Sequence, residues 1–162
     1  MATTEKIPKG YATVTPYLVL NDVPTAIEFY KRAFGAEQLS RMDMPNGQVA
    51  HAEIKIGNSI LMMTTEMDSP DETMKTKGPL TLKGTPVSFM IYVDDVDKVA
   101  KTAVAAGIQT LRPVENQFYG DRSGVFKDPF GHIWSIATHI EDVPIDLMKQ
   151  KMNEMYTKGQ TP

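Results

Sequence analysis

The chain repeats one pattern, a strand, a helix and then three strands, and this repeat constrains the fold more than any other feature of the sequence. The pair Asp95-Val96 follows Asp22-Val23 by 73 residues. The turn glycine Gly131 likewise follows Gly57 by 74 residues. A near-constant offset of this kind indicates a duplicated βαβββ unit. Because one unit cannot bury its own sheet, we expect the two units to pair in an α+β fold.

The repeat divides the chain into five parts. Residues 1–11 are predicted to be a loose polar arm, residues 12–64 the first βαβββ module and residues 86–140 the second. Residues 65–85 break the pattern, since Thr, Asp, Glu, Lys, Gly and Pro dominate there, and we interpret them as the linker between the modules. Residues 141–162 are predicted to be a C-terminal helix and tail.

Local signals place the elements within these parts. Asp22 is expected to cap a helix that ends at Gly35, and Asp95 one that ends at Gly107. Alternation and strand-forming residues predict strands over 14–20, 38–44, 48–56, 59–64 and 86–93. Residues 144–156 are predicted to form an amphipathic helix. Its apolar face, typical of a helix that covers a core or a dimer partner, carries Ile145, Met148, Met152 and Met155.

Composition narrows the classes of function. The 162 residues carry a net charge of −3 and contain no basic run, so we expect no nucleic-acid partner. The absence of cysteine excludes disulfides and thiolate chemistry. No apolar run reaches the roughly 18 residues of a membrane helix. The first residues also lack an apolar signal core, so we expect a cytoplasmic protein without a membrane partner.

Residues 117–139 hold the densest group of candidate site residues. Val125–Lys127 and Ile133–Ala137 are predicted strands on either side of an Asp-Pro-Phe-Gly turn at 128–131. Polar and aromatic residues that could line a binding site precede the first of these strands, namely Gln117, Tyr119, Asp121 and Arg122. Asp121 and Arg122 are adjacent and should point to opposite faces of an extended segment, so one of them can face a cavity while the other supports the fold.

Other residues in the chain have two interpretations. The aromatic residues of the predicted strands and their flanks are either core residues or walls of a cavity, and these are Tyr17, Tyr92, Phe118, Tyr119 and Trp134. His132 follows the turn glycine and is interpreted as a turn residue that bonds nearby backbone. His139 lies at the end of a predicted strand, where a surface or interface position is expected.

The stretches 117–122, 128–132 and 134–139 resemble the C-terminal half of vicinal oxygen chelate proteins, the superfamily of glyoxalase I, bleomycin-resistance proteins and extradiol dioxygenases. The N-terminal half of that family resembles residues 14–18, 26–30 and 51–57. The resemblance is to the PhnB-like branch and runs from about residue 12 to residue 156. It implies two curved mixed sheets that form an incomplete barrel around a ligand cavity, commonly in a homodimer.

The resemblance also implies where a metal would bind. Glyoxalase-like members hold a divalent metal with His and Glu side chains from four strands, and the metal acts as a Lewis acid on vicinal substrate oxygens. In this sequence the four positions correspond to Thr15, Leu61 or Met62, Ser88 and Ser135. None supplies the imidazole or carboxylate that such a metal needs. We therefore predict no cofactor.

Two function hypotheses follow from the sequence. The first is a metal-free protein that binds a small amphipathic molecule in the cavity between the sheets. Its predicted lining is His51, Glu53, Gln117, Tyr119, Asp121, Arg122 and Trp134. The alternative is a lyase, isomerase or dioxygenase with a divalent metal near His51 and Glu53, which are two residues apart on one strand face. The sequence leaves open whether the protein is an enzyme.

Overall fold

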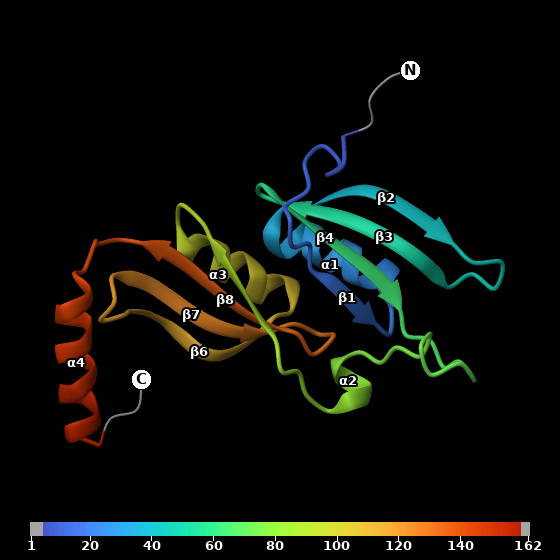
Figure 1. Cartoon of the computed structure of the whole chain (residues 1–162). Helices are drawn as coiled ribbons and strands as arrows, with labels where there is room; N and C mark the ends of the chain where they lie inside the picture. The colour runs from blue at the N-terminus through green and yellow to red at the C-terminus, as the bar shows by residue number, and fades with distance from the viewer. Residues whose placement is uncertain (1–4, 160–162) are drawn as a thin grey trace.

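The computed structural model describes residues 5–159 and shows two βαβββ modules followed by a terminal helix (Figure 1). The first module consists of β1 (Tyr17–Leu20), α1 (Val23–Phe34), β2 (Glu37–Asp43), β3 (Val49–Ile56) and β4 (Ser59–Thr65). The second consists of β5 (Ser88–Tyr92), α3 (Val96–Ala106), β6 (Gln109–Asn116), β7 (Asp121–Lys127) and β8 (Ile133–His139). A short helix, α2 (Pro79–Leu82), lies between the modules, and α4 (Ile145–Thr157) follows the second. The predicted α+β fold is confirmed.

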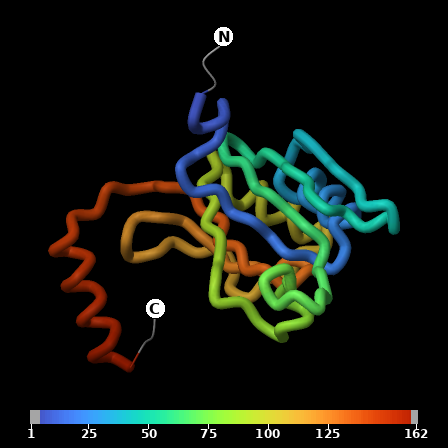
Figure 2. The backbone as a smooth tube through the Cα atoms, turned by 45° about the vertical axis from the view of Figure 1, so that its right-hand side comes forward, coloured from blue at the N-terminus to red at the C-terminus, as the bar shows by residue number. Residues whose placement is uncertain are grey.

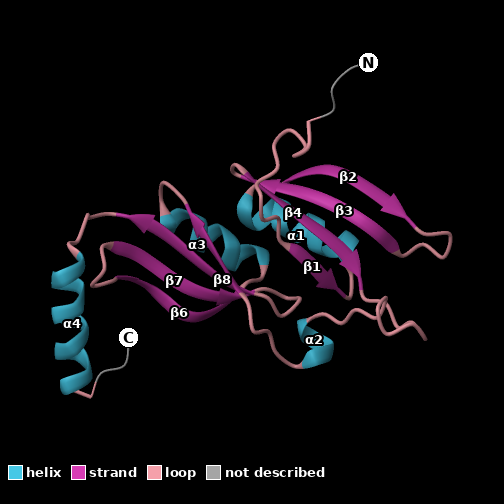
Figure 3. Cartoon of the chain, in the orientation of Figure 1, coloured by secondary structure: helices cyan, strands magenta, loops and turns pink. Residues whose placement is uncertain are grey.

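Both modules form a four-stranded sheet with the same strand order. The first sheet runs β1-β4-β3-β2, and the second runs β5-β8-β7-β6. In each sheet the first and last strands of the module pair in parallel, and the other neighbours pair antiparallel. Figure 3 shows the two sheets side by side, each with a helix behind it. The two halves of the chain therefore have the same topology, as the internal repeat predicts.

The two long helices of the modules begin at the aspartate caps and end at the glycines that the sequence predicts. The Asp22 carboxylate accepts a hydrogen bond from the backbone N–H of Thr25 at 3.0 Å, and Asp95 accepts one from Lys98 at 3.0 Å. Gly35 and Gly107 follow α1 and α3 with φ values of 66° and 110°. Glycine adopts this left-handed backbone without the strain that a Cβ atom would add.

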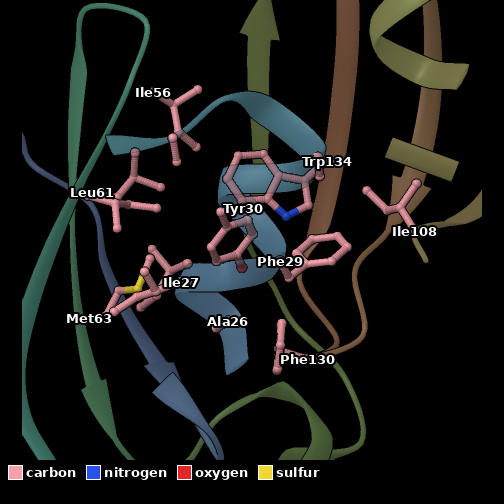
Figure 4. Close-up of a cluster of buried hydrophobic side chains, with 14 of the residues drawn as sticks. Ala26, Ile27, Phe29, Tyr30, Ile56, Leu61, Met63, Ile108, Phe130 and Trp134 are labelled. Atoms are coloured by element: carbon pink, nitrogen blue, oxygen red, sulfur yellow. The ribbon is translucent and has the colours of Figure 1, made fainter. Parts of the chain in front are cut away.

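The hydrophobic core lies where α1 and α3 pack against each other and against one face of each sheet (Figure 4). Phe29 and Tyr30 come from α1, and Phe130 and Trp134 come from the second module. The ring centroids of Tyr30 and Trp134 are 5.5 Å apart, and those of Phe29 and Phe130 are 5.9 Å apart. The two modules therefore share one core. The face of each sheet that points away from α1 and α3 is called the open face below.

A buried carboxylate reinforces the junction between the modules. Asp128, in the turn before β8, accepts hydrogen bonds from the Tyr30 hydroxyl at 2.7 Å and from Trp134 Nε1 at 2.8 Å. Its other oxygen accepts the backbone N–H groups of Phe130 and His132, both at 2.9 Å. A buried carboxylate is tolerated only when its lone pairs are satisfied in this way. The turn that the sequence predicts is thus also an anchor for α1 of the other module.

Two strands begin three or more residues away from their predicted positions. β1 starts at Tyr17 rather than Val14, because Pro16 has no N–H to donate and Val14 lies exposed outside the sheet. β7 starts at Asp121, four residues before the predicted Val125. Asp121 and its neighbour Arg122 pair with the last residues of β8, and their polar side chains are accommodated by hydrogen bonds, Asp121 to Tyr92 and His139 and Arg122 to Asp97.

The segment predicted as a linker packs against the first module. Met67 and Thr76 form an isolated bridge, and α2 follows it. The Glu66 carboxylate accepts hydrogen bonds from the Gly78 N–H at 2.8 Å and from the Thr81 hydroxyl at 2.7 Å. A Cβ atom at Gly78 would lie 2.6 Å from the Val19 carbonyl oxygen, so only glycine fits beside β1. The linker is therefore more ordered than its composition suggests.

Helix α4 lies at one end of the molecule, beyond the turn between β6 and β7, in both views of the backbone (Figures 1 and 2). The predicted C-terminal helix is confirmed, with bounds Ile145–Thr157. No residue of α4, all of which is described by the structure, is buried. Within residues 5–159, no helix is both long enough and apolar enough to span a membrane.

Candidate functional site

The open faces of the two sheets carry the polar clusters from which a site can be built. Strand register gives one row across each open face, because paired residues on neighbouring strands point the same way. The first row is Tyr17, Met62, Glu53 and Ser40. The second row is Tyr92, Ala137, Ser123 and Glu115. Tyr17 and Tyr92, at the outer ends of the rows, are 50% and 62% exposed, whereas Ala137 and Ser123 in the middle of the second row are buried.

On the first sheet, a tyrosine, a histidine and a glutamate form a chain of hydrogen bonds. The Tyr17 hydroxyl lies 3.0 Å from Nδ1 of His51, and Nε2 of His51 lies 3.1 Å from Oε1 of Glu53. A hydrogen bond from Tyr11 lowers the pKa of Glu53, and His51 contributes to the same shift. Glu53 is thus held as a carboxylate next to an imidazole and two phenols.

On the second sheet, Asp121 organises a similar cluster. This carboxylate is 4% exposed, accepts a hydrogen bond from the Tyr92 hydroxyl at 2.9 Å and lies 2.8 Å from Nδ1 of His139. Nε2 of His139 lies 3.0 Å from Asp142. The hydrogen bond to Asp121, followed by that to Asp142, raises the pKa of His139. The hydrogen bond to Asp121 also raises the pKa of Tyr92. A buried carboxylate therefore holds an exposed phenol and an exposed imidazole in fixed positions.

Two other predicted site residues lie next to this second cluster. The Tyr119 hydroxyl lies 3.4 Å from Oγ of Ser123, which belongs to the open-face row. The side-chain amide of Gln117 donates to the backbone carbonyl oxygens of Glu115 at 3.3 Å and Ser123 at 3.5 Å. Tyr119 can therefore contact a molecule on the open face, whereas Gln117 chiefly stabilises the turn between β6 and β7.

The structure places Arg122 and Trp134 away from the open faces. Arg122 forms two hydrogen bonds of 2.7 Å with the Asp97 carboxylate on α3, on the helix side of the sheet. Trp134 is 1% exposed and packs in the core, 4.9 Å from Phe34 and 4.9 Å from Phe89 between ring centroids. Arg122 and Trp134 thus have the structural one of the two roles that the sequence leaves open for each, and Asp121 lies on the open-face side of the second sheet.

Three residues of the clusters were absent from the predicted lining, namely Tyr17, Tyr92 and His139. Strand periodicity contained part of the signal, because Tyr17 alternates with the buried residues of β1 and Tyr92 alternates with the half-buried residues of β5. The contact of His139 with Asp121 depends on the register of β7 and β8, and it joins the ends of the two strands that lie farthest from the predicted turn.

The four positions that correspond to metal ligands do not fit a metal. The second position corresponds to Met62 rather than Leu61, because Met62 pairs with Tyr17 on the open face, whereas Leu61 is buried in the core. Ser135 occupies the matching place in the second sheet, opposite Met90. The donor set therefore comprises three hydroxyls and a thioether, without imidazole or carboxylate. Across residues 5–159, no three His, Asp or Glu side chains gather in a metal-binding arrangement.

A groove of about 1200 Å³ runs between the modules, and of the residues in the two clusters only Tyr92 lines it. Its apolar walls include Phe34, Leu61, Phe89 and Ile91, and it follows β5, an edge strand of the second sheet. An edge strand offers unpaired backbone groups, which suit another protein chain better than a small molecule. For small-molecule chemistry the open faces are the stronger candidate, because they hold the two clusters in which histidine, carboxylate and tyrosine side chains are hydrogen-bonded to one another.

Comparisons with known proteins agree with this architecture. Residues 11–136 match the model of the Glyoxalase/Bleomycin resistance protein/Dioxygenase superfamily. The "Uncharacterized protein Rv0887c" of Mycobacterium tuberculosis is 36% identical over 140 residues, which span 86% of this chain and 82% of that protein.

Solved structures show the same fold. The crystal structure of TioX from Micromonospora sp. ML1 is 25% identical and has a TM-score of 0.62, covering 80% of this chain and 99% of TioX. A PhnB protein from Bacillus cereus is 18% identical with a TM-score of 0.60, covering 78% of this chain and 99% of that one. The second likeness concerns the fold alone.

Proposed function

The chain belongs to the glyoxalase/bleomycin resistance protein/dioxygenase superfamily, and from this premise we propose that it binds a small amphipathic molecule without the metal of glyoxalase-like members. The ligand lies against the open sheet faces. We place the chain in the PhnB-like branch, for which the likeness to the Bacillus cereus PhnB protein gives support at the level of fold.

The observation that carries this proposal is the presence of a preorganised polar cluster on each open face. Tyr17, His51 and Glu53 are bonded to one another on the first sheet, and Tyr92, Asp121 and His139 are bonded on the second. Exposed apolar side chains, Met42 and Met90, lie on the same faces. A few fixed polar groups among apolar surface are typical of a site for an amphipathic ligand.

The proposal includes a homodimer. Within one chain the two sheets lie side by side, so each sheet has helices on one face and its open face stays uncovered (Figure 3). A second copy can place its sheet over the first and enclose the ligand between a face from each chain. The edge strands β1 and β5 and the groove along β5 offer the surface for this contact.

A second candidate function has one supporting observation. His51 and Glu53 converge, with 3.1 Å between Nε2 and Oε1, as a noncanonical divalent metal site would require. Such a site needs at least one further protein donor, and the nearest neighbours in the cluster are phenols. An enzyme that uses this metal is therefore the alternative to the binding protein.

A thermal-shift screen of small amphipathic compounds, with metal content measured on untagged protein, tests both candidates. We expect substoichiometric metal and a hit whose stabilisation is lost in His51→Ala and in Tyr92→Phe. The control Glu28→Gln, on the solvent side of α1, should bind as the parent does. Stoichiometric metal that is lost in His51→Ala would replace the proposal with the metal enzyme. A hit that binds equally to all variants would show that the ligand does not lie on the open faces.

A further inference from the structure

The duplicated fold has two equivalent junctions between a turn of one module and a helix of the other, and one of them is filled by an aromatic ring. At this junction the β7–β8 turn, residues 128–132, packs against α1. It inserts Phe130, whose ring centroid lies 5.9 Å from that of Phe29 and 6.2 Å from that of Tyr30. Phe130 is 5% exposed, so the turn closes the space beside α1.

At the second junction, the β3–β4 turn and α3 leave this space open. The turn has two residues, Gly57 and Asn58, and therefore no counterpart of Phe130. The 73-residue offset of the repeat places Thr102 on α3 where α1 carries Phe29. Gly57, Asn58 and Thr102 all line the groove of about 1200 Å³ between the modules. The part of the groove between α3 and this turn, called the pit below, corresponds to the place that Phe130 fills in the other half.

The groove also runs along the free edge of β5. The N–H of Val93 donates to the carbonyl oxygen of Ala137 on β8. Because backbone groups alternate between the two sides of a strand, those of Met90 and Tyr92 point away from β8, toward the free edge. Residues 89–93 all line the groove. The groove therefore offers hydrogen-bonding backbone groups beside an apolar pit.

The corresponding edge of β1 is covered by the chain itself. Val19 has in β1 the place that Tyr92 has in β5, at the same 73-residue offset. A Cβ atom at Gly78 in the linker would lie 2.6 Å from the Val19 carbonyl oxygen, and the His132 ring also faces this backbone. In one half of the fold, polypeptide from the linker and from the β7–β8 turn thus covers the edge strand and fills the junction.

We propose that an extended segment of another protein fills the second junction, by pairing with the edge of β5 and placing an aromatic side chain in the pit. Strand addition of this kind takes its affinity from backbone hydrogen bonds and its specificity from pockets for alternate side chains. The inference goes beyond the small-molecule function, because the pit is lined by α3 and the β3–β4 turn rather than by the open faces.

The walls next to the pit suit an aromatic ring. Phe34 and Phe89 are half-buried and line the groove, and each of their ring centroids lies 4.9 Å from that of Trp134. Val99 on α3 adds an aliphatic surface. A further ring, supplied by the partner, can pack against Phe34 and Phe89 in the offset or edge-to-face geometries that aromatic pairs prefer.

Charge indicates how the segment lies in the groove. Arg32, in the last turn of α1, is exposed at the rim and belongs to none of the ion pairs among residues 5–159. On the α3 side, Lys98 lines the groove together with Asp94 and Asp95, so its charge is balanced there. We therefore expect an acidic residue of the partner on the α1 side of the aromatic residue, close to Arg32.

The first test selects phage-displayed peptides of about nine residues on the parent protein, after depletion on Thr102→Phe, whose added ring occupies the pit. We expect enriched peptides to share a central aromatic residue, apolar residues at alternate positions and an acidic residue on one side. By fluorescence polarisation, synthetic copies should bind Thr102→Phe at least about tenfold more weakly than the parent. Lys101→Phe, with the same ring at an exposed position outside the groove, should bind as the parent does. No enriched peptide, or equal binding by Thr102→Phe and the parent, would overturn the proposal.

The second test asks whether the peptide adds to β5 as a strand. N-methylation of the peptide, one residue at a time, removes one backbone donor each time, and only alternate donors face β5. We expect at least about tenfold weaker binding at alternate positions and little change at the positions between them. Arg32→Glu should prefer a peptide whose acidic residue is changed to lysine. An N-methylation series without alternation, or an Arg32→Glu variant that does not distinguish the two peptides, would refute the proposed mode of binding.

A second copy of this chain is the competing occupant, because β5 is also available for the dimer contact of the proposed function. Sedimentation velocity with labelled peptide decides between the two. We expect the peptide to bind without changing the oligomeric state of the parent. Dissociation of a parental dimer by the peptide would assign the groove to the second copy and overturn the proposal.

Failure of this inference can be told apart from failure of the proposed function. Thr102→Phe leaves the clusters around His51 and Asp121 unchanged, so it should keep the thermal shift of the screening hit. If the peptides do not bind and this shift persists, only the strand-addition site is refuted. If the shift is absent from the parent, the small-molecule function is refuted whatever the peptides show.

Discussion

Asp128 is the residue with the largest predicted effect on stability. Its carboxylate is 3% exposed and accepts four hydrogen bonds, two of them from side chains of different modules. Asp128→Ala should lower the free energy of unfolding by about 3–5 kcal/mol, the range for breaking a buried polar network. Tyr30→Phe removes one of these bonds and should cost about 1–2 kcal/mol. Urea unfolding of both variants measures these values, and near-parental stability of Asp128→Ala would contradict the assigned role.

Two histidines should give stability opposite dependences on pH. Burial lowers the pKa of His132 from its usual 6.5, so the unfolded state takes up a proton first as the pH falls. Stability should therefore decline as the pH drops below about 6.5, and His132→Asn should flatten this decline between pH 6.5 and 5. The nearby charged group is Asp128, and the ring also faces Phe89 and the backbone of Val19.

For His139 the sign is reversed, because its hydrogen bonds to Asp121 and Asp142 raise its pKa above 6.5. Its stabilising contribution is present below pH 6.5 and is lost as the pH rises through the higher folded-state pKa. His139→Asn should therefore lose stability only on the acidic side. Urea unfolding midpoints of both variants, measured across pH 5 to 8, test these two dependences. If the midpoints of His132→Asn and the parent change with pH in the same way, His132 does not titrate as described.

At the scale of elements, the β6–β7 turn fixes the segment that leads to α4. Gly120 has a φ of 98°, and its carbonyl oxygen accepts the N–H groups of Ile140 and Glu141. A Cβ atom there would clash with the Glu141 carbonyl oxygen. Gly120→Ala should therefore cost clearly more than the roughly 1 kcal/mol of backbone strain alone. Gly47→Ala is the matched control, because Gly47 also has a positive φ but open space around it. Equal melting temperatures for the two variants would argue against close packing at Gly120.

Elements whose signals are local could be predicted from the sequence, and those that depend on distant contacts could not. Asp22 and Asp95 cap helices through residues three positions away, so each cap is visible in a short window. The sequence leaves Trp134 open as a cavity wall or a core residue, because its indole bonds Asp128 only once the turn is folded. Asp121 could be predicted as a candidate site residue because polar and aromatic residues surround it in the sequence. Its partner His139 could not, because it lies 18 residues away on the neighbouring strand.

At the scale of the whole molecule, the duplication accounts for both the core and the site. Each module buries one sheet face against the shared α1 and α3 layer, so the other face of each stays available for a ligand or a partner. The internal repeat predicts this pairing of modules. It does not predict which open faces meet in a dimer, since a repeat of this kind can pair within a chain or between chains.

Mixing variants decides how the faces combine. One variant, His51→Ala with Glu53→Ala, disables the first sheet, and the other, Tyr92→Phe with His139→Ala, disables the second. If each site joins the first sheet of one chain to the second sheet of its partner, both homodimers lack an intact site and each heterodimer has one. Random exchange of subunits then restores about one quarter of the parental binding capacity, because about half of the dimers are mixed and each mixed dimer has one intact site of two. Titration of the screening hit into the mixture by calorimetry measures this fraction. A capacity of zero after complete exchange, with both variants folded and dimeric, would mean that each site is built from the two sheets of a single chain. Sites built from two copies of the same sheet would instead show as binding by each variant before mixing.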